Sequence, residues 1–256
     1  MATVTSQVTG RDYDAEEWAL RVDLAAAFRL AVHFDWHASV ANHFSAAVSA
    51  DGKRFLLNPR WQHFSTIKAS DLLLLDADDE EVMVRADPPD PTAWCIHGAV
   101  HAAVPQARVL LHCHPPYATA LCGLKDPALK PIDQNTARFF GRVAIDLGFG
   151  GLALEDDEGR RLARALGDHS VMLMGNHGVT VTGATVAEAF EDLYYLERAA
   201  QTMILAYSTG QPLSIMADTL AEAVAADTEP FRRDLGAAHF AHLKSMLDRT
   251  DSSYRQ

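Results

Sequence analysis

The sequence contains few cysteines and no long apolar run. Its 256 residues include three cysteines, Cys95, Cys113 and Cys122, and this odd, sparse set argues against a disulfide framework and for a reducing compartment. The longest apolar runs, such as residues 72–75, fall far short of the ~20 residues that span a bilayer. No basic stretch followed by an apolar one is found near residue 1, so we read no secretory signal and expect a cytoplasmic protein.

Basic residues are also scarce relative to acidic ones. Lys and Arg number 22 and Asp and Glu number 34, which gives a formal net charge of −12. A phosphate backbone or an anionic membrane would be repelled, so we expect neither nucleic acid nor membrane as a partner. No repeat or low-complexity linker divides the chain. We therefore expect one domain over residues 1–256, with a core at about 16–208 and a C-terminal helical segment at 218–249.

Hydrophobic periodicity predicts groups of short strands separated by helices. The expected helices are 14–35, 91–104, 117–121, 156–166, 185–210 and 218–249. The expected strands are 43–49, 54–58, 72–76, 108–113, 170–174 and 179–182. Most strands come as hairpins, with helices clustered between the groups, and this arrangement predicts an α+β fold.

Two groups of histidines are candidate metal ligands. His112 and His114 lie at the end of a predicted strand, and His177 lies in a glycine-flanked loop after another. Alternate strand residues share a face, so the first two imidazoles can bind one ion, and a third from the loop would complete an open, catalytic type of site. His97 and His101 share a helix face at i, i+4 spacing. From spacing alone, metal ligation and hydrogen bonding in a core remain open for both groups.

Two longer motifs resemble the class II aldolase/adducin family. Residues 104–117 read VPQARVLLHCHPPY, and residues 175–197 read GNHGVTVTGATVAEAFEDLYYLE. Weaker matches are residues 41–45, ANHFS, for the family's early Asn-x-x-Ser segment, and residues 56–59, LLNP. Residues 130–143, KPIDQNTARFFGRV, resemble the adducin-like branch more than the sugar-phosphate aldolases. The resemblance extends over about residues 16–208.

The resemblance implies a three-layer α/β/α fold with a central, mainly antiparallel sheet. It also implies that His112, His114 and His177 hold one divalent metal ion per chain, zinc, manganese or iron, which polarises a carbonyl. Because the family's enzymes are usually tetramers, a homo-oligomer, and most simply a tetramer, is expected. Asn42 and Ser45 of the early segment are expected to contact the substrate.

The acid/base position departs from the pattern of the sugar-phosphate aldolases. Those enzymes carry a glutamate 19 residues before the first histidine of the His-x-His pair, and the residue here is Ala93. An alanine cannot move a proton, so the usual proton shuttle is missing. Its small side chain is expected to leave room for part of a substrate.

The phosphate-binding loops depart as well. Arg60 and Trp61 stand in one loop, and Pro91 and Thr92 in the other. A bulky Trp61 and a Pro91 without an N–H remove much of a backbone cradle for phosphate, so we do not expect a phosphorylated sugar as substrate. Arg60 can instead pair with a carboxylate, although a solvent-exposed role is also open. Arg60 and Thr92 are therefore candidate substrate contacts.

These departures favour a metal-dependent carbon–carbon lyase that acts on a small anionic substrate. Decarboxylation of a hydroxy-aromatic or keto carboxylate, through a metal-stabilised enolate, needs no prior deprotonation of a hydroxyl group and so tolerates Ala93. The product carbon must still receive a proton. His97, His101 or a metal-bound water are the candidate donors.

Three other functions stay open. One is a metal-dependent aldolase or epimerase with another base, for which the sequence offers Glu197, Tyr194, Tyr195 and Asp133. Another is a non-catalytic, adducin-like binding domain, against which the three retained histidines argue. The last is oxygen chemistry at iron. The remaining histidines, His43 among them, are expected to be structural or exposed.

Overall fold

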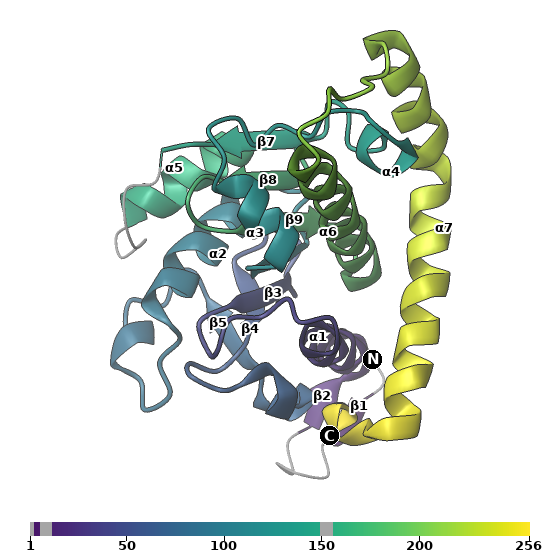
Figure 1. Ribbon diagram of the computed structural model, residues 1–256. Coiled ribbons are helices and arrows are strands. Elements are labelled where there is room, and N and C mark those ends of the chain that lie inside the picture. The colour runs from purple at the N-terminus through teal and green to yellow at the C-terminus, as the bar shows by residue number, and fades with distance from the viewer. Residues whose placement is uncertain (1–2, 6–11, 149–155) are drawn as a thin grey trace.

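A seven-stranded sheet lies at the centre of the molecule (Figure 1). The computed structural model describes residues 3–5, 12–148 and 156–256. The strands of the sheet are β3 (His43–Ala47), β4 (Arg54–Leu57), β5 (Leu73–Asp76), β6 (Val109–Cys113), β7 (Val143–Asp146), β8 (Val171–Met174) and β9 (Val179–Gly183). They lie in the order β5-β4-β3-β6-β9-β8-β7. Neighbours pair antiparallel except β7 and β8, which are parallel.

Helices cover both faces of this sheet. In Figure 1, α1 (Ala15–His33) and α6 (Val186–Ser208) lie on one side of the strands, and α2 (Pro91–Ala103) and α5 (Asp156–Leu166) lie on the other. The long α7 (Asp218–Thr250) packs outside α6. Shorter helices are α3 (Pro116–Cys122), α4 (Gln134–Ala137), η1 (Phe64–Thr66), η2 (Ala69–Asp71), η3 (Val82–Val84) and η4 (Ser252–Arg255). The expected three-layer architecture is confirmed.

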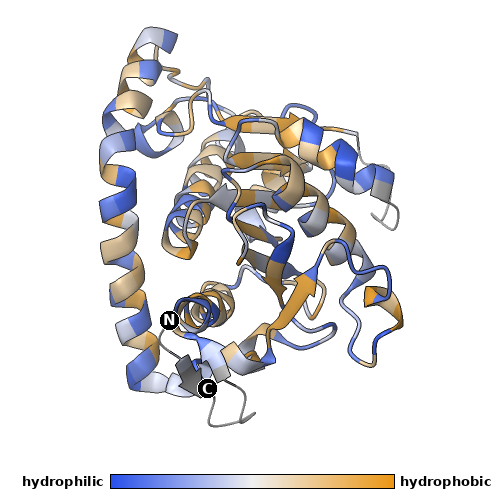
Figure 2. Cartoon of the chain, turned by 180° about the vertical axis from the view of Figure 1, so that it is seen from behind, coloured by the Kyte–Doolittle hydropathy of each residue, from blue (hydrophilic) through white to orange (hydrophobic). Residues whose placement is uncertain are grey.

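Burial on both faces explains the composition of the central strands. Every residue of β6 is buried, so residues 109–111 form an apolar run before His112 instead of alternating with polar residues. Leu111 packs in the cluster formed with α1 and α6, whereas Leu110 packs in the cluster formed with α2 and α5. Figure 2 shows hydrophobic residues along the strands and a mixture of hydrophilic and hydrophobic residues along α7.

The expected mainly antiparallel sheet is confirmed, and most element bounds agree to within two residues. The strand expected at 43–49 ends at Ala47, because Ser49 and Asp51 form the turn to β4. The pattern missed β7, the parallel edge strand, because only its partner β8 forms a clear apolar run. It also missed a small separate hairpin of β1 (Thr3–Thr5) and β2 (Asp12–Asp14). In the described part of the chain, no helix combines the length and hydropathy needed to cross a membrane.

Candidate active site

The end of β6 and the β8–β9 turn bring three histidines together. His112 is in β6, His114 follows it, and His177 is in the turn. Backbone geometry explains the glycine after His177: a Cβ on Gly178 would lie 2.3 Å from the His114 Cδ2 atom and 2.8 Å from the Cys113 carbonyl oxygen. A residue without a side chain is therefore required for the turn to approach β6.

The three imidazoles have the geometry of a metal-ligand set. One ring nitrogen from each of His112, His114 and His177 lies within 4.8 Å of the others. His112 donates from Nδ1 to the Val179 carbonyl oxygen at 3.0 Å, so its Nε2 carries the lone pair. His114 Nε2 is buried without a hydrogen-bond partner among the described residues, an arrangement that a metal ion would satisfy.

Burial also keeps these rings neutral, as ligands must be. It lowers the pKa of His114 to about 4, lowers that of His112 well below its ordinary value, and lowers that of His177 as well. Neutral imidazole is the form that binds a metal ion. The donor set therefore fits a divalent ion with three nitrogen ligands.

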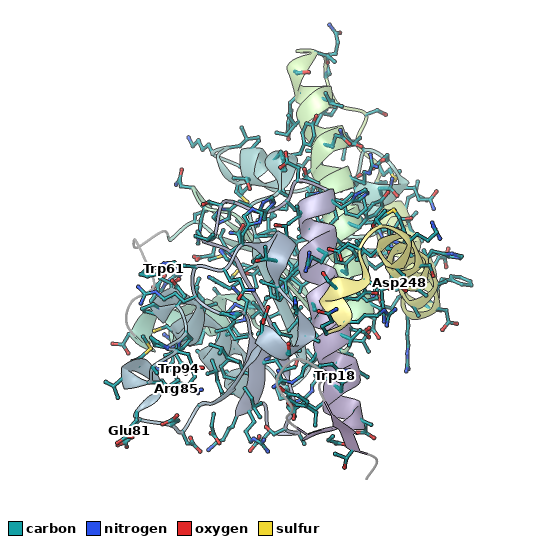
Figure 3. The ribbon with its side chains drawn as sticks, turned by 90° about the horizontal axis from the view of Figure 1, so that it is seen from below. Trp18, Trp61, Glu81, Arg85, Trp94 and Asp248 are labelled. Atoms are coloured by element: carbon teal, nitrogen blue, oxygen red, sulfur yellow. The ribbon has the colours of Figure 1, made fainter. Side chains whose placement is uncertain are left out.

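The histidines open onto a pocket of about 320 Å³ between the sheet, α2 and α5. Its apolar wall suits a flat or aliphatic group and is formed by Val40, Ala41, Trp61, Ile96, Leu162 and Met174. Trp61 is 67% exposed and lies at the edge of the molecule in Figure 3. It also has a positive φ of 61°, an unusual backbone conformation for tryptophan.

The carboxylates that line the pocket are already engaged in hydrogen bonds. Asp90 Oδ1 accepts from the backbone N–H and the hydroxyl of Thr92, at 2.9 and 2.6 Å, and so begins α2. Asp146 and Glu158 both bind the guanidinium of Arg161, with distances of 2.7–2.8 Å. Arg161 is the only Arg or Lys among the described residues that line the pocket. Its guanidinium is already paired with these two carboxylates.

Ala93 lies next to the pocket instead of on its wall. Thr92 and Ile96, one helical turn apart, line the pocket, and Ala93 is not among the residues that line it. Ala93 is 1% exposed and packs in a cluster with Phe55 and Leu57. Ala93 therefore forms no part of the described pocket wall, and the expectation that its small side chain leaves room for substrate stays a prediction. Its methyl group completes an apolar layer under α2.

The candidate proton donors of α2 lie behind the pocket wall. His97 and His101 are both buried and bind Ser45 through their ring nitrogens. Ser45, expected to contact substrate, is also fully buried and does not line the pocket. Asn42 is buried too, and its Oδ1 accepts from the Ala38 N–H at 2.6 Å, which orders the loop before β3.

The remaining candidates fall at two places. Thr92 lines the pocket, and the Arg60 guanidinium stacks over the Trp61 ring, 4.0 Å from its centroid. Glu197 and Tyr194 line a different cleft, and the Glu197 carboxylate accepts from the first N–H groups of α3 at 2.8 and 2.9 Å. Burial raises the pKa of Glu197. Glu197 therefore caps α3 and lies in a different cleft from the pocket onto which the histidine cluster opens.

Sequence reasoning missed His43, which the structure places in the pocket wall. His43 pairs with His112 across β3 and β6, and the two rings stack with centroids 4.7 Å apart. Burial lowers the pKa of His43 to about 4. The signal that could have found it is strand register: once β3 is paired with β6, the histidines of ANHFS and LLHCH face the same side.

Known proteins are similar to this chain in sequence and in fold. The family model for the class II aldolase and adducin N-terminal domain matches residues 22–204. The chain belongs to the class II aldolase/adducin family. A Caulobacter vibrioides protein named as an aldolase class 2 protein is 31% identical to this chain over 221 residues. The match covers 86% of this chain and 85% of the Caulobacter protein.

Two further relatives extend the comparison. The crystal structure of an aldolase II superfamily protein from Pseudomonas syringae superposes with a TM-score of 0.88 at 34% identity, covering 98% of this chain and all of that one. Decarboxylase NovR of Streptomyces niveus is 32% identical over 161 residues, 63% of this chain and 59% of that protein. The family therefore includes a relative named for breaking a bond to a carboxyl group.

Proposed function

We propose that this family member is a divalent-metal-dependent carbon–carbon lyase that decarboxylates a small hydroxy-aromatic or keto carboxylate. The observation that carries the proposal is the composition of the ligand cluster. His112, His114 and His177 gather without a carboxylate among the described residues of the cluster, and Ala93 occupies the acid/base position. The similarity to decarboxylase NovR supports the same reaction class.

The charge of the cluster favours an anionic substrate. All three ligands are neutral, so no ligand side chain offsets the charge of a divalent cation bound to them. A substrate carboxylate can supply that charge itself, and the attraction is strong in a site partly shielded from water. When bound, the metal ion provides a Lewis acid that stabilises negative charge developing on a substrate oxygen.

The rest of the pocket favours a monoanion with an apolar body. Asp90, Asp146 and Glu158 line the walls and Arg161 is paired with two of them, so a phosphate dianion meets more repulsion than a carboxylate. The apolar wall, from Ile96 to Trp61, suits an aromatic ring or a short carbon chain. A sugar phosphate, with many hydroxyl groups and a dianion, fits neither feature.

We further propose that the protein is a homo-oligomer, most simply a tetramer. Apolar side chains are exposed along α7, where Leu220, Phe231 and Leu235 are 54%, 69% and 44% exposed. Phe231 and Leu235 share a helix face at i, i+4 spacing, and a contiguous exposed apolar patch commonly marks an interface. Since α7 lies outside the three layers of the fold, a neighbouring chain can reach it (Figure 1).

The function is tested by a product screen on protein supplied with zinc or manganese. We expect carbon dioxide release from hydroxy-aromatic or keto carboxylates, about one divalent ion per chain, and loss of both in His177→Ala. Aldehyde release from fuculose- or rhamnulose-type phosphates would replace the decarboxylase with an aldolase. Inactivity on both panels, with no metal bound, would favour an adducin-like binding domain.

A further inference from the structure

Buried side chains form a line of hydrogen bonds from the pocket wall to a backbone carbonyl beyond α2. His43 Nδ1 lies 2.7 Å from His97 Nε2, and His97 Nδ1 contacts the Ser45 hydroxyl. The same hydroxyl lies 2.6 Å from His101 Nε2. His101 Nδ1 lies 2.7 Å from the Ala107 carbonyl oxygen, between α2 and β6. None of the four side chains is more than 4% exposed.

The imidazoles of His97 and His101 are neutral at ordinary pH. Burial lowers the pKa of His101 to about 4 and lowers that of His97 well below its ordinary value. A neutral imidazole carries one N–H and one lone pair. The donor and the acceptor of every hydrogen bond in the line can therefore be assigned, starting from the Ala107 carbonyl oxygen.

A carbonyl oxygen can only accept, so His101 carries its proton on Nδ1 and donates to Ala107. His101 Nε2 must then accept, and the Ser45 hydroxyl donates its one proton to it. With that proton used, the Ser45 oxygen accepts from His97 Nδ1–H.

The same reasoning continues to the pocket. His97 Nε2 is left as a lone pair, so it accepts from His43 Nδ1–H. The ring nitrogen of His43 that remains for the pocket is then Nε2, without a proton. Reversing any one link would place two protons, or two lone pairs, against each other in a site that excludes water.

We propose that the Ala107 carbonyl, acting through His101, Ser45 and His97, fixes the tautomer of His43 so that its Nε2 accepts hydrogen bonds from a ligand in the pocket. His97, Ser45 and His101 are then positioning residues, and His43 is the group that contacts the ligand. Their placement on β3 and α2 explains why they are buried behind the wall and do not line it.

The fixed acceptor narrows the class of substrate, and this step rests on the proposed function. His43 stacks on His112, so its Nε2 lies beside the metal-ligand cluster. A hydroxyl group can donate to it, whereas an ionised carboxylate or phosphate cannot. The preferred substrate therefore carries a hydroxyl donor near the carboxylate, as a hydroxy-aromatic acid does, and a keto acid without a hydroxyl is disfavoured.

The tautomers are measured by long-range ¹H–¹⁵N spectra of histidine-labelled, metal-free protein. In the wild type we expect the proton on Nδ1 in His43, His97 and His101. In Ser45→Ala we expect His43 and His97 to become mixtures of tautomers, while His101 stays fixed by Ala107. A wild-type His43 protonated on Nε2, or unchanged tautomers in Ser45→Ala, would overturn the proposal.

Two controls separate this effect from a general disturbance. Ser45→Thr keeps the hydroxyl on a strand residue and is expected to restore the wild-type tautomers. The His37 and His63 pair, joined at 3.0 Å through their Nε2 atoms outside this line, is expected to give unchanged spectra in both variants. Failure of the threonine variant to restore His43, with a folded protein, would contradict a role for the hydroxyl.

The acceptor role is tested with phenol and anisole, which differ in the hydroxyl proton. Phenol, added up to its solubility limit, is expected to shift the His43 Nε2 resonance of the wild type more than anisole does. Equal shifts, or no shift with phenol, would overturn the acceptor role. Neither experiment uses turnover, so both can succeed even if the screen for carbon dioxide release fails.

Discussion

His43 stacks on His112 across the centre of the sheet, with ring centroids 4.7 Å apart and planes inclined by 25°. The pair connects the metal-ligand cluster to the hydrogen-bonded line that ends at Ala107. Both residues come from neighbouring antiparallel strands, His43 from β3 and His112 from β6. Because strands place side chains rigidly, this arrangement supports the proposal of a preformed acceptor beside the proposed metal site.

Gly178→Ala should weaken metal binding without unfolding the protein. The added Cβ would lie 2.3 Å from His114 Cδ2, so either the ring or the turn that carries His177 must move. We expect the affinity for zinc to fall by at least about tenfold, as measured by competition with a chelator.

Gly98→Ala is the matched control for that change. It lies within α2, and a Cβ there would meet nothing closer than Phe55 Cζ at 3.9 Å. Zinc affinity should stay at the wild-type value, with equal or higher stability from the better helix former. Wild-type affinity in Gly178→Ala would show that the turn does not constrain the ligands.

Ala93→Glu should not create an aldolase. The new carboxylate would enter the apolar cluster of Phe55 and Leu57, where burial of a charge costs several kcal/mol. We expect a lower melting temperature and no cleavage of fuculose-type phosphates. Ala93→Leu separates size from charge, since it adds volume without a carboxylate. A stable Ala93→Glu variant that releases aldehyde from a sugar phosphate would disprove this prediction.

Stability should fall on mild acidification, in part through His101. Burial lowers its pKa in the folded state to about 4, below the unfolded value near 6.5. Its contribution is complete above the unfolded pKa and is lost as the pH falls toward the folded value, by about 1.4 kcal/mol per pH unit at most.

Urea denaturation of metal-free protein at about pH 7 and about pH 5 measures this effect. Wild type should lose more unfolding free energy between these values than His101→Gln, which has no titrating group there. Part of the slope should remain in the variant, because burial also lowers the pKa of His43 to about 4. An identical slope in both proteins would mean that His101 does not titrate in this range.

Phe231→Asp should reduce the oligomeric state. Phe231 is 69% exposed on α7, and a charge there would be buried on association. Light scattering should report a multiple of 28.0 kDa for the wild type and a smaller particle for the variant. Glu222→Ala, an exposed change on the same helix, is the control. A wild type that is monomeric at micromolar concentration would exclude the homo-oligomer.

The order of short strands and helices predicted the α+β class, and the resemblance to the class II aldolase/adducin family predicted the three layers. Strand β6 and helix α6, which carry the longest motifs, are buried over most of their length, so hydrophobic pattern and structure agree there. The His-x-His spacing predicted that His112 and His114 lie close together, because residues two apart on a strand point to the same side.

The strand register and the packing of α2 on the sheet could not be predicted from the sequence pattern. His43 and Ser45 look unrelated to His97 and His101 until β3 is paired with β6 and α2 is packed over them. Ala93 follows Thr92 directly in α2, yet Thr92 lines the pocket and Ala93 packs in the apolar cluster. Such distinctions depend on tertiary packing, which local periodicity does not encode.

The central claim is that the reaction breaks the bond to a carboxyl carbon at the histidine cluster. The most direct measurement follows ¹³C from carboxyl-labelled hydroxy-aromatic acids in metal-supplied protein by mass spectrometry. We predict labelled carbon dioxide from the wild type and from the exposed control His242→Ala, and none from His114→Ala. Label retained in every compound, together with cleavage of an unlabelled sugar phosphate, would contradict the claim.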